Sequence, residues 1–167
     1  MAKCLVVGWA AMLPLAVMAA PVPEISRPAG SAQATGTVHT LRQIPEACTR
    51  LEGVFTGQAA SPYAFNVVRT SAQCQPRARM LNVANANPSE AAGWKLNDVI
   101  TVPSAQCSGL LARVEVWRKP GAPAPARDGQ GQSRIYLQDA KAQAAAGQIA
   151  AVPMFAAKWE LIGKPCQ

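Results

Sequence analysis

The strictest pattern in this sequence is an alternation of apolar and polar residues at positions 107–119, CSGLLARVEVWRK. In an extended chain, successive side chains point to opposite sides, so every second residue shares a face. The apolar face consists of Leu110, Ala112, Val114 and Val116. The opposite face carries Arg113, Glu115 and Trp117. Valine and tryptophan favour strands, so the pattern predicts a central strand with one buried face and one solvent-facing face.

Residues 1–19 have the layout of a secretory signal peptide. Lys3 precedes an apolar run, and small residues end that run. A cut after Ala19 places Val17 and Ala19 at the third and first positions before it, where signal peptides have small residues. The run is short for a membrane span. We therefore expect an exported protein, periplasmic or extracellular, with no transmembrane segment in the mature chain. A retained N-terminal anchor is the alternative.

The cysteines agree with export, because an even number in an oxidising compartment indicates disulfides. After residue 19 the chain contains Cys48, Cys74, Cys107 and Cys166. Four cysteines allow three pairings. We favour Cys48 with Cys74, which bracket two neighbouring strand candidates, and Cys107 with Cys166, which would tie the central strand to the last one. Paired-cysteine spacing is absent and His39 is the one histidine, so we expect neither a metal nor another cofactor.

Composition divides the chain into three parts. Residues 20–46 are rich in proline, glycine and alanine without a sustained period, so we expect a flexible leader after the signal peptide of residues 1–19. Residues 47–167 are then expected to form a single disulfide-stabilised β-rich domain. Loss of residues 1–19 removes Lys3 alone among the charged residues, so 15 of the 16 Lys and Arg and all 9 Asp and Glu remain. The mature chain is therefore basic.

Several short strands are predicted in this domain, separated by turn signals. The strand candidates besides the central one are residues 51–57, 63–70, 77–83, 94–102, 133–138 and 154–162. The first two are expected to form a hairpin, and 133–138 to pair with the central strand across the Pro/Gly-rich loop 120–132. Asp98 breaks the alternation of 94–102, which predicts a bulge or turn at Asn97 and Asp98.

An alanine-rich helix is expected after Asp139 and before Pro153, ahead of the last strand. The fold class that follows is mainly β, with α+β as the alternative. We expect an antiparallel sandwich or a partly open barrel of about six to seven strands with one helix. A small oligonucleotide- or oligosaccharide-binding barrel is one form compatible with this order.

The residues argue against most catalysis, because no histidine follows His39 to activate a nucleophile. Glu115 and Glu160 each have a basic residue two positions earlier, so cross-strand ion pairs explain them. Asp98 is explained by turn capping. We therefore expect no enzyme, and therefore no catalytic residue. The alternative within catalysis is a small hydrolase that uses acids alone, with Asp98 or Glu115 as its catalytic group.

A basic ridge around the central strand is the remaining candidate for function. Its members are Arg113, Trp117, Arg118, Lys119, Arg127 and Arg134. Such a surface suits an anionic envelope polymer, carbohydrate or another protein, whereas a single aromatic argues against nucleic acid. The sequence thus predicts an exported, non-catalytic binding or structural domain of the cell envelope or extracellular space. A hydrolase inhibitor that acts through loop 120–132 is the second hypothesis.

Overall fold

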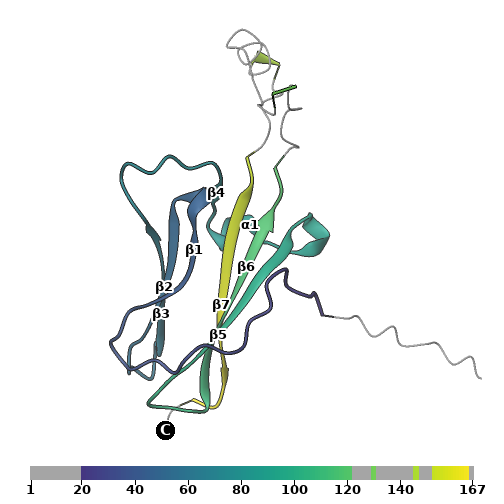
Figure 1. Cartoon of the computed structure of the whole chain (residues 1–167). Helices are drawn as coiled ribbons and strands as arrows, with labels where there is room; N and C mark the ends of the chain where they lie inside the picture. Colours follow the sequence, from purple (N-terminus) through teal and green to yellow (C-terminus); the bar gives the residue numbers. More distant parts are fainter. Residues whose placement is uncertain (1–19, 122–128, 131–144, 147–151, 166–167) are drawn as a thin grey trace, which may run out of the picture.

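The computed structural model of the protein describes residues 20–121, 129–130, 145–146 and 152–165. The described residues form seven strands in two sheets, which face each other as the layers of a sandwich (Figure 1). The three-stranded sheet contains, in order, β1 (His39–Ile44), β2 (Thr49–Phe55) and β3 (Tyr63–Arg69). The four-stranded sheet contains, in order, β4 (Arg79–Met80), β7 (Met154–Gly163), β6 (Leu110–Lys119) and β5 (Lys95–Pro103). The predicted mainly β fold is confirmed, and of its two forms the chain adopts the sandwich.

The stretch of strict alternation is indeed a central strand. β6 pairs antiparallel with β5 along one edge and with β7 along the other. Its apolar face, from Leu110 to Val116, is buried between the sheets. Because both edges of β6 are occupied, the expected pairing of residues 133–138 with this strand is wrong. Residues 133–138 themselves lie outside the described part.

The main core lies between the two sheets. The smaller sheet contributes Leu41, Ile44, Leu51, Phe55 and Tyr63. The larger sheet contributes Ile100, Val102, Leu110, Ala112, Val114, Val116, Phe155 and Ala157. Full burial of a large apolar side chain stabilises a fold by about 1.5–3 kcal/mol. The register of β6 is therefore fixed, since a slip by one residue would turn its apolar face away from this core.

A second apolar cluster covers part of the other face of the larger sheet. Trp94, Leu96, Trp117 and Ala156 are buried there, and Leu81 and Ala86 pack against them. The chain between β4 and β5 reaches this face through the short helices α1 (Val83–Ala86) and η2 (Glu90–Ala92). The prediction that Trp117 faces solvent is therefore wrong. Its face was assigned correctly by alternation, but the segment that covers this face gave no periodic signal.

The strand break predicted at Asn97 and Asp98 is present. The register between β5 and β6 shifts between Leu96 and Asp98, so one extra residue is accommodated there. The shift places three successive residues, Leu96, Asn97 and Asp98, in buried positions. A bulge is the usual way to re-aim a side chain inside a strand.

The leader predicted to be flexible is largely ordered. His39–Ile44 forms β1, and residues 24–36, which we call the strap, run along the outer edge of β5 (Figure 1). Backbone N–H groups of Glu24, Ile25, Gly30 and Gln33 donate to carbonyls of β5. The prediction of flexibility for residues 20–46 is wrong here, because backbone pairing with an existing strand needs no apolar period in the added segment.

Between β3 and β5 the chain differs in detail from the prediction. Residues 77–83 were expected to form a strand, but only Arg79–Met80 pair with β7. Asn82 then accepts a hydrogen bond from the Ala84 N–H and caps α1, which ends the extended segment. The helical turn expected at Ser89 is present as η2, with Ser89 as its cap. The alanine-rich helix and loop 120–132 lie mostly outside the described residues.

The first predicted disulfide is confirmed, since Cys48 and Cys74 are bonded and their Cα atoms lie 5.8 Å apart. It joins the start of β2 to the loop that follows β3. Cys166 lies outside the described residues, so its bond to Cys107 stays a prediction. Lys164, two positions before it, has its carbonyl 3.9 Å from Cys107 Sγ, so the C-terminal segment runs beside Cys107.

Candidate functional site

The sandwich has two long sides, and the chain covers only one of them. On the first side, the margin where β1 and β5 lie across from each other, the strap pairs with the edge of β5 in parallel. Glu24 accepts hydrogen bonds from Asn97 and from Arg118, which hold the start of the strap. The Arg118 hydrogen bond holds the pKa of Glu24 below its ordinary value. We call this margin the closed side.

Asp98 lies at the centre of the closed side and is completely buried. Arg27 of the strap approaches its Oδ2 atom at 2.7 Å, and Arg42 of β1 approaches the same atom at 3.4 Å. Neither contact has hydrogen-bond geometry, and both carboxylate oxygens lack a hydrogen-bond donor among the described residues. Burial lowers the pKa of Arg42. The bulge in β5 thus places the Asp98 carboxylate between Arg27 of the strap and Arg42 of β1. These contacts link the strap, β1 and β5.

The opposite margin, between β3 and β7, has free strand edges. On β3, the carbonyl of Pro62 and the N–H of Thr70 form hydrogen bonds toward β2. Backbone groups of successive residues point to opposite edges of a strand. The N–H and C=O groups of Phe65 and Val67 therefore point away from the sheet. On β7, the Phe155 carbonyl accepts a hydrogen bond from the Leu81 N–H and so points away from β6. By the same alternation, the backbone N–H and C=O groups of Trp159 point to the free edge of β7. None of these outward groups has a backbone partner within the described ranges. We call this margin the open side.

An apolar groove of about 360 Å³ lies on the open side. Its lining residues are Phe65, Val67, Met80, Leu81, Asn82, Val83, Ala157 and Trp159. Most of the lining side chains are apolar, and the Asn82 side-chain oxygen is engaged in capping α1. Val67 is 50% exposed and Trp159 is 43% exposed. Exposed apolar side chains that gather around a hollow are typical of a binding surface.

A row of rings supports the lower end of the groove. Tyr63 packs against Trp159 with ring centroids 5.8 Å apart, and against Phe55 at 4.8 Å. His39 Nε2 lies 3.0 Å from the Tyr63 hydroxyl, and burial lowers the pKa of His39. Burial also raises the pKa of Tyr63. Trp159 is therefore held from behind by a packed aromatic row while its outer part faces solvent.

The sequence assigned the exposed aromatic to the wrong tryptophan. Trp117 is 6% exposed, whereas Trp159 lies at the surface. Trp159 does share the inward face with Phe155 and Ala157, but β4 covers only the first two residues of β7. Its position at an uncovered edge depends on strand order. The only signal for it in the sequence was an aromatic residue near the end of an alternating segment.

The predicted basic ridge does not form as a continuous surface in the described residues. Arg113 pairs with Glu115 at 3.1 Å and with Glu160 at 3.7 Å. Arg118 pairs with Glu24 at 2.7 Å. Lys119 lies at the end of β6. Arg127 and Arg134 lie outside the described residues.

Glu115, the first acid raised as a catalytic candidate, is ion-paired with Arg113. Glu115 and Glu160 line one hollow of about 330 Å³ with Arg113 between them. The Arg113–Glu160 pair is a cross-strand ion pair of the predicted kind, whereas Arg113 and Glu115 lie on the same strand. The second acid candidate, Asp98, lies in the closed side with two arginines. Within the described ranges, no three His, Cys, Asp or Glu side chains gather as ligands for a metal.

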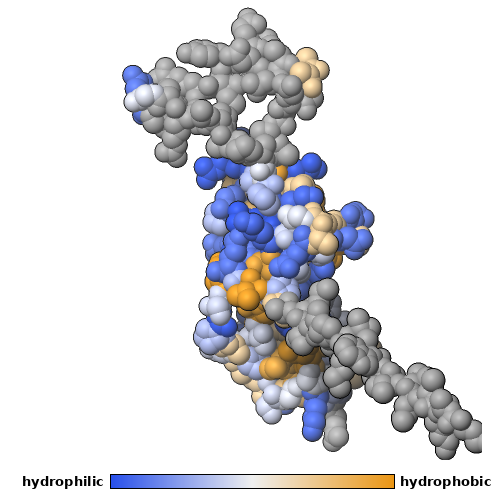
Figure 2. All heavy atoms as spheres, turned by 90° about the vertical axis from the view of Figure 1, so that its right-hand side faces the viewer, coloured by the Kyte–Doolittle hydropathy of each residue, from blue (hydrophilic) through white to orange (hydrophobic). Residues whose placement is uncertain are grey.

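The side of the molecule away from the smaller sheet is mixed in character. Figure 2 views this side, where hydrophilic residues predominate and hydrophobic ones form separate patches. No described helix has the length and apolar character needed to cross a membrane.

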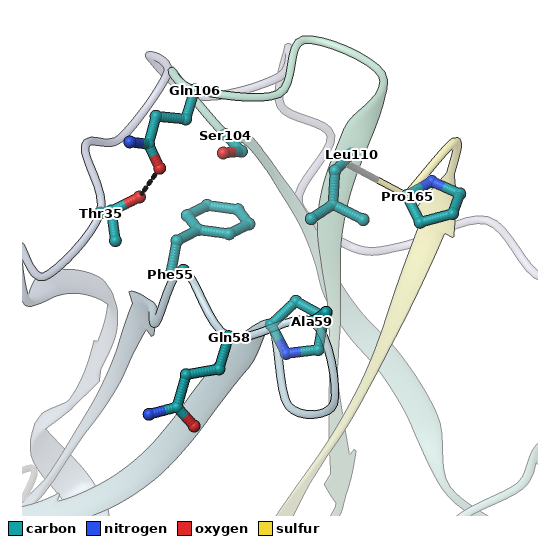
Figure 3. A pocket seen from close by; sticks show the side chains of 10 residues that line it. Thr35, Phe55, Gln58, Ala59, Ser104, Gln106, Leu110 and Pro165 are labelled. Carbon is teal, nitrogen blue, oxygen red and sulfur yellow. Dashed lines mark hydrogen bonds between the residues drawn. The ribbon is translucent and has the colours of Figure 1, made fainter. Parts of the chain in front are cut away.

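A larger hollow of about 480 Å³ lies at one end of the sandwich (Figure 3). Phe55 and Leu110 form its apolar floor, and Ser104 and Gln106 lie on its rim. Thr35 of the strap donates a hydrogen bond to Gln106 across this rim. Its polar rim is thus partly satisfied within the chain, and its floor is buried. The groove on the open side differs in leaving large apolar side chains exposed.

Comparison of the chain with protein-family models, curated proteins and solved structures finds no match in any of the three. The class that the structure defines is a mainly β sandwich with a disulfide, one covered side and one open side.

Proposed function

We propose that the protein is an exported, non-catalytic binding domain of the cell envelope or extracellular space that holds another protein in the groove of the open side. The observation that carries this proposal is the exposure of Val67 and Trp159 around an apolar hollow. Exposed apolar side chains that gather into one patch mark interaction sites, whereas scattered ones do not. The Cys48–Cys74 disulfide supports export, because such bonds persist in oxidising compartments.

Export has its own test. Mass spectrometry of the protein recovered from the periplasm or medium should give a chain that begins at Ala20. Without reduction, its mass should be that of a chain with both disulfides. A chain that retains residues 1–19, or one with free thiols at the four cysteines, would contradict export in this form.

Binding is tested with two valines that are exposed to a similar degree. Val67 lies in the groove, whereas Val38, 60% exposed, is not among the residues that line it. The mature protein, Val67→Glu and Val38→Glu are immobilised and exposed to envelope extract. We expect a component retained by wild type and Val38→Glu and lost by Val67→Glu. Identical retention by all three would contradict binding through the groove.

A further inference from the structure

We infer that the occupant of the groove is an extended acidic segment of another polypeptide, which adds as a strand to the free edge of β3 and inserts an apolar side chain. This inference rests on the proposed function and specifies its partner.

The backbone of β3 selects a polypeptide. Phe65 and Val67 each present an N–H donor and a C=O acceptor to the open side, and none is paired within the described part of the chain. A row of alternating donors and acceptors at strand spacing is matched by another extended main chain. A lipid tail has no such groups, and a glycan has no matching repeat.

The groove specifies one side chain of that segment. Side chains of an added strand alternate between the two faces, so those on the inner face would enter the space between β3 and β7. Phe65, Met80 and Trp159 surround this space with apolar surface, and the indole N–H of Trp159 is the one polar group among these three side chains. The inserted side chain is therefore apolar, and aliphatic or aromatic residues suit it.

Positive charge at the ends of β3 and β4, close to the groove but outside its lining, favours an acidic segment. Arg69 ends β3, Arg77 precedes β4, and Arg79 is adjacent to Met80 of the lining. None of the three forms an ion pair within the described residues. Arg69 donates to the carbonyls of Ser71, Ala72 and Cys74, which orients its guanidinium without neutralising it. Carboxylates on the partner would complement these charges and speed association.

The closed side shows that this fold accepts an added extended segment. The strap pairs with β5 through backbone hydrogen bonds spread from Glu24 to Gln33. A single carboxylate of the strap, Glu24, bonds to Arg118 at the strand end. The proposed partner would repeat this arrangement on the open side, with main-chain pairing along an edge and an acid placed against an arginine.

The test uses a displayed library of random linear peptides, selected on the disulfide-intact mature protein and counter-selected on Val67→Glu. We expect enriched peptides with alternating apolar residues and an excess of Asp and Glu. They should bind Val38→Glu as they bind wild type. Arg79→Glu should weaken them several-fold, whereas Lys95→Glu, at the start of β5, should not. Circular dichroism checks that each variant remains folded.

Backbone pairing is tested on the best enriched peptide by N-methylation of alternate amides. Methylation of the set that faces β3 should abolish binding, and methylation of the other set should be tolerated. Tolerance of both sets would overturn strand addition, and enrichment without acidic residues would overturn the charge argument. If no peptide distinguishes wild type from Val67→Glu while the envelope component still does, the occupant is not a linear segment and the proposed function stands. Concentration-dependent dimerisation lost in Val67→Glu would make a second copy the occupant and overturn the inference.

Discussion

On the closed side and on the open side alike, strands have an edge that no strand of their own sheet covers in full, yet the chain treats the two sides differently. On the closed side, the strap covers the edge of β5, and Asp98 holds strap and β1 by charge. On the open side, β4 covers two residues of β7, and Val67 and Trp159 remain exposed. Uncovered edges invite association, and proteins usually protect them. This contrast is the basis of our proposal that the open side binds a partner.

The largest effect is expected from Asp98→Asn, which removes the charge at the centre of the closed side. Arg42 would remain in a largely buried position without a counter-charge. Loss of one member of a buried ion pair costs about 3–5 kcal/mol of unfolding free energy. Urea denaturation measures this loss of unfolding free energy. The control is the double variant Arg42→Met with Asp98→Leu, which should recover much of the loss. Wild-type stability in Asp98→Asn would show that charge does not hold this side.

Gly53→Ala tests the aromatic row behind the open side. A Cβ atom at Gly53 would lie 1.7 Å from the Tyr63 hydroxyl, so the ring must move. Such overpacking costs about 1–3 kcal/mol. Thermal unfolding should show this loss, and the tryptophan fluorescence, to which Trp159 contributes, should shift as the support of Trp159 moves. Gly30→Ala is the matched control, since its Cβ would make ordinary contact 3.5 Å from Thr101 O. An equal effect of both changes would contradict the packing argument.

A smaller effect is expected at the start of the strap. The pKa of Glu24 is lowered on folding, so its stabilisation is present above its ordinary value of 4.5 and is lost as the pH falls through the lowered value. Acid should therefore loosen the strap before the core. Glu24→Gln should cost only about 0.2–1 kcal/mol, as expected for an exposed pair. The protection factors of the Glu24 and Ile25 amides against hydrogen exchange should fall in this variant and depend less on pH. Unchanged hydrogen exchange would show that Glu24 does not hold the strap on β5.

The smallest effect on stability is expected at the open side itself. Val67 is half exposed, so Val67→Glu should change the free energy of unfolding by no more than about 0.5 kcal/mol. Val38→Glu should behave alike. Urea denaturation of both variants measures the free energy of unfolding. The two variants should differ only in binding, which Val67→Glu loses. A large loss of stability in Val67→Glu alone would mean that the groove is part of the core rather than a free surface.

The sequence predicted well those elements whose side chains alternate between core and solvent. β6, the β2–β3 hairpin and the bulge of β5 follow from alternation and its interruption. The strap could not be predicted in this way, because it joins the sheet through backbone groups that any residue carries. Its prolines and glycines therefore indicated a flexible leader.

The site was harder to predict than the fold, because it depends on which strands lie at an edge. Trp117 and Trp159 both lie on strands with clear alternation. Burial of Trp117 requires the segment that carries α1, and exposure of Trp159 requires β4 to end after two residues. Neither arrangement is local in sequence. Once the strand order is known, the burial of Trp117 and the exposure of Trp159 follow from the face of the sheet on which each lies.

The most direct test of the account is residue-resolved hydrogen exchange of the mature protein, alone and with an enriched peptide. Without peptide, the paired amides of Ile25 and Gly30 on the closed side should be protected, and the outward amides of Phe65 and Val67 should exchange freely. The peptide should protect Phe65 and Val67 and leave the strap unchanged. Protection of Phe65 and Val67 in the free monomer, or their free exchange in the complex, would contradict strand addition on the open side.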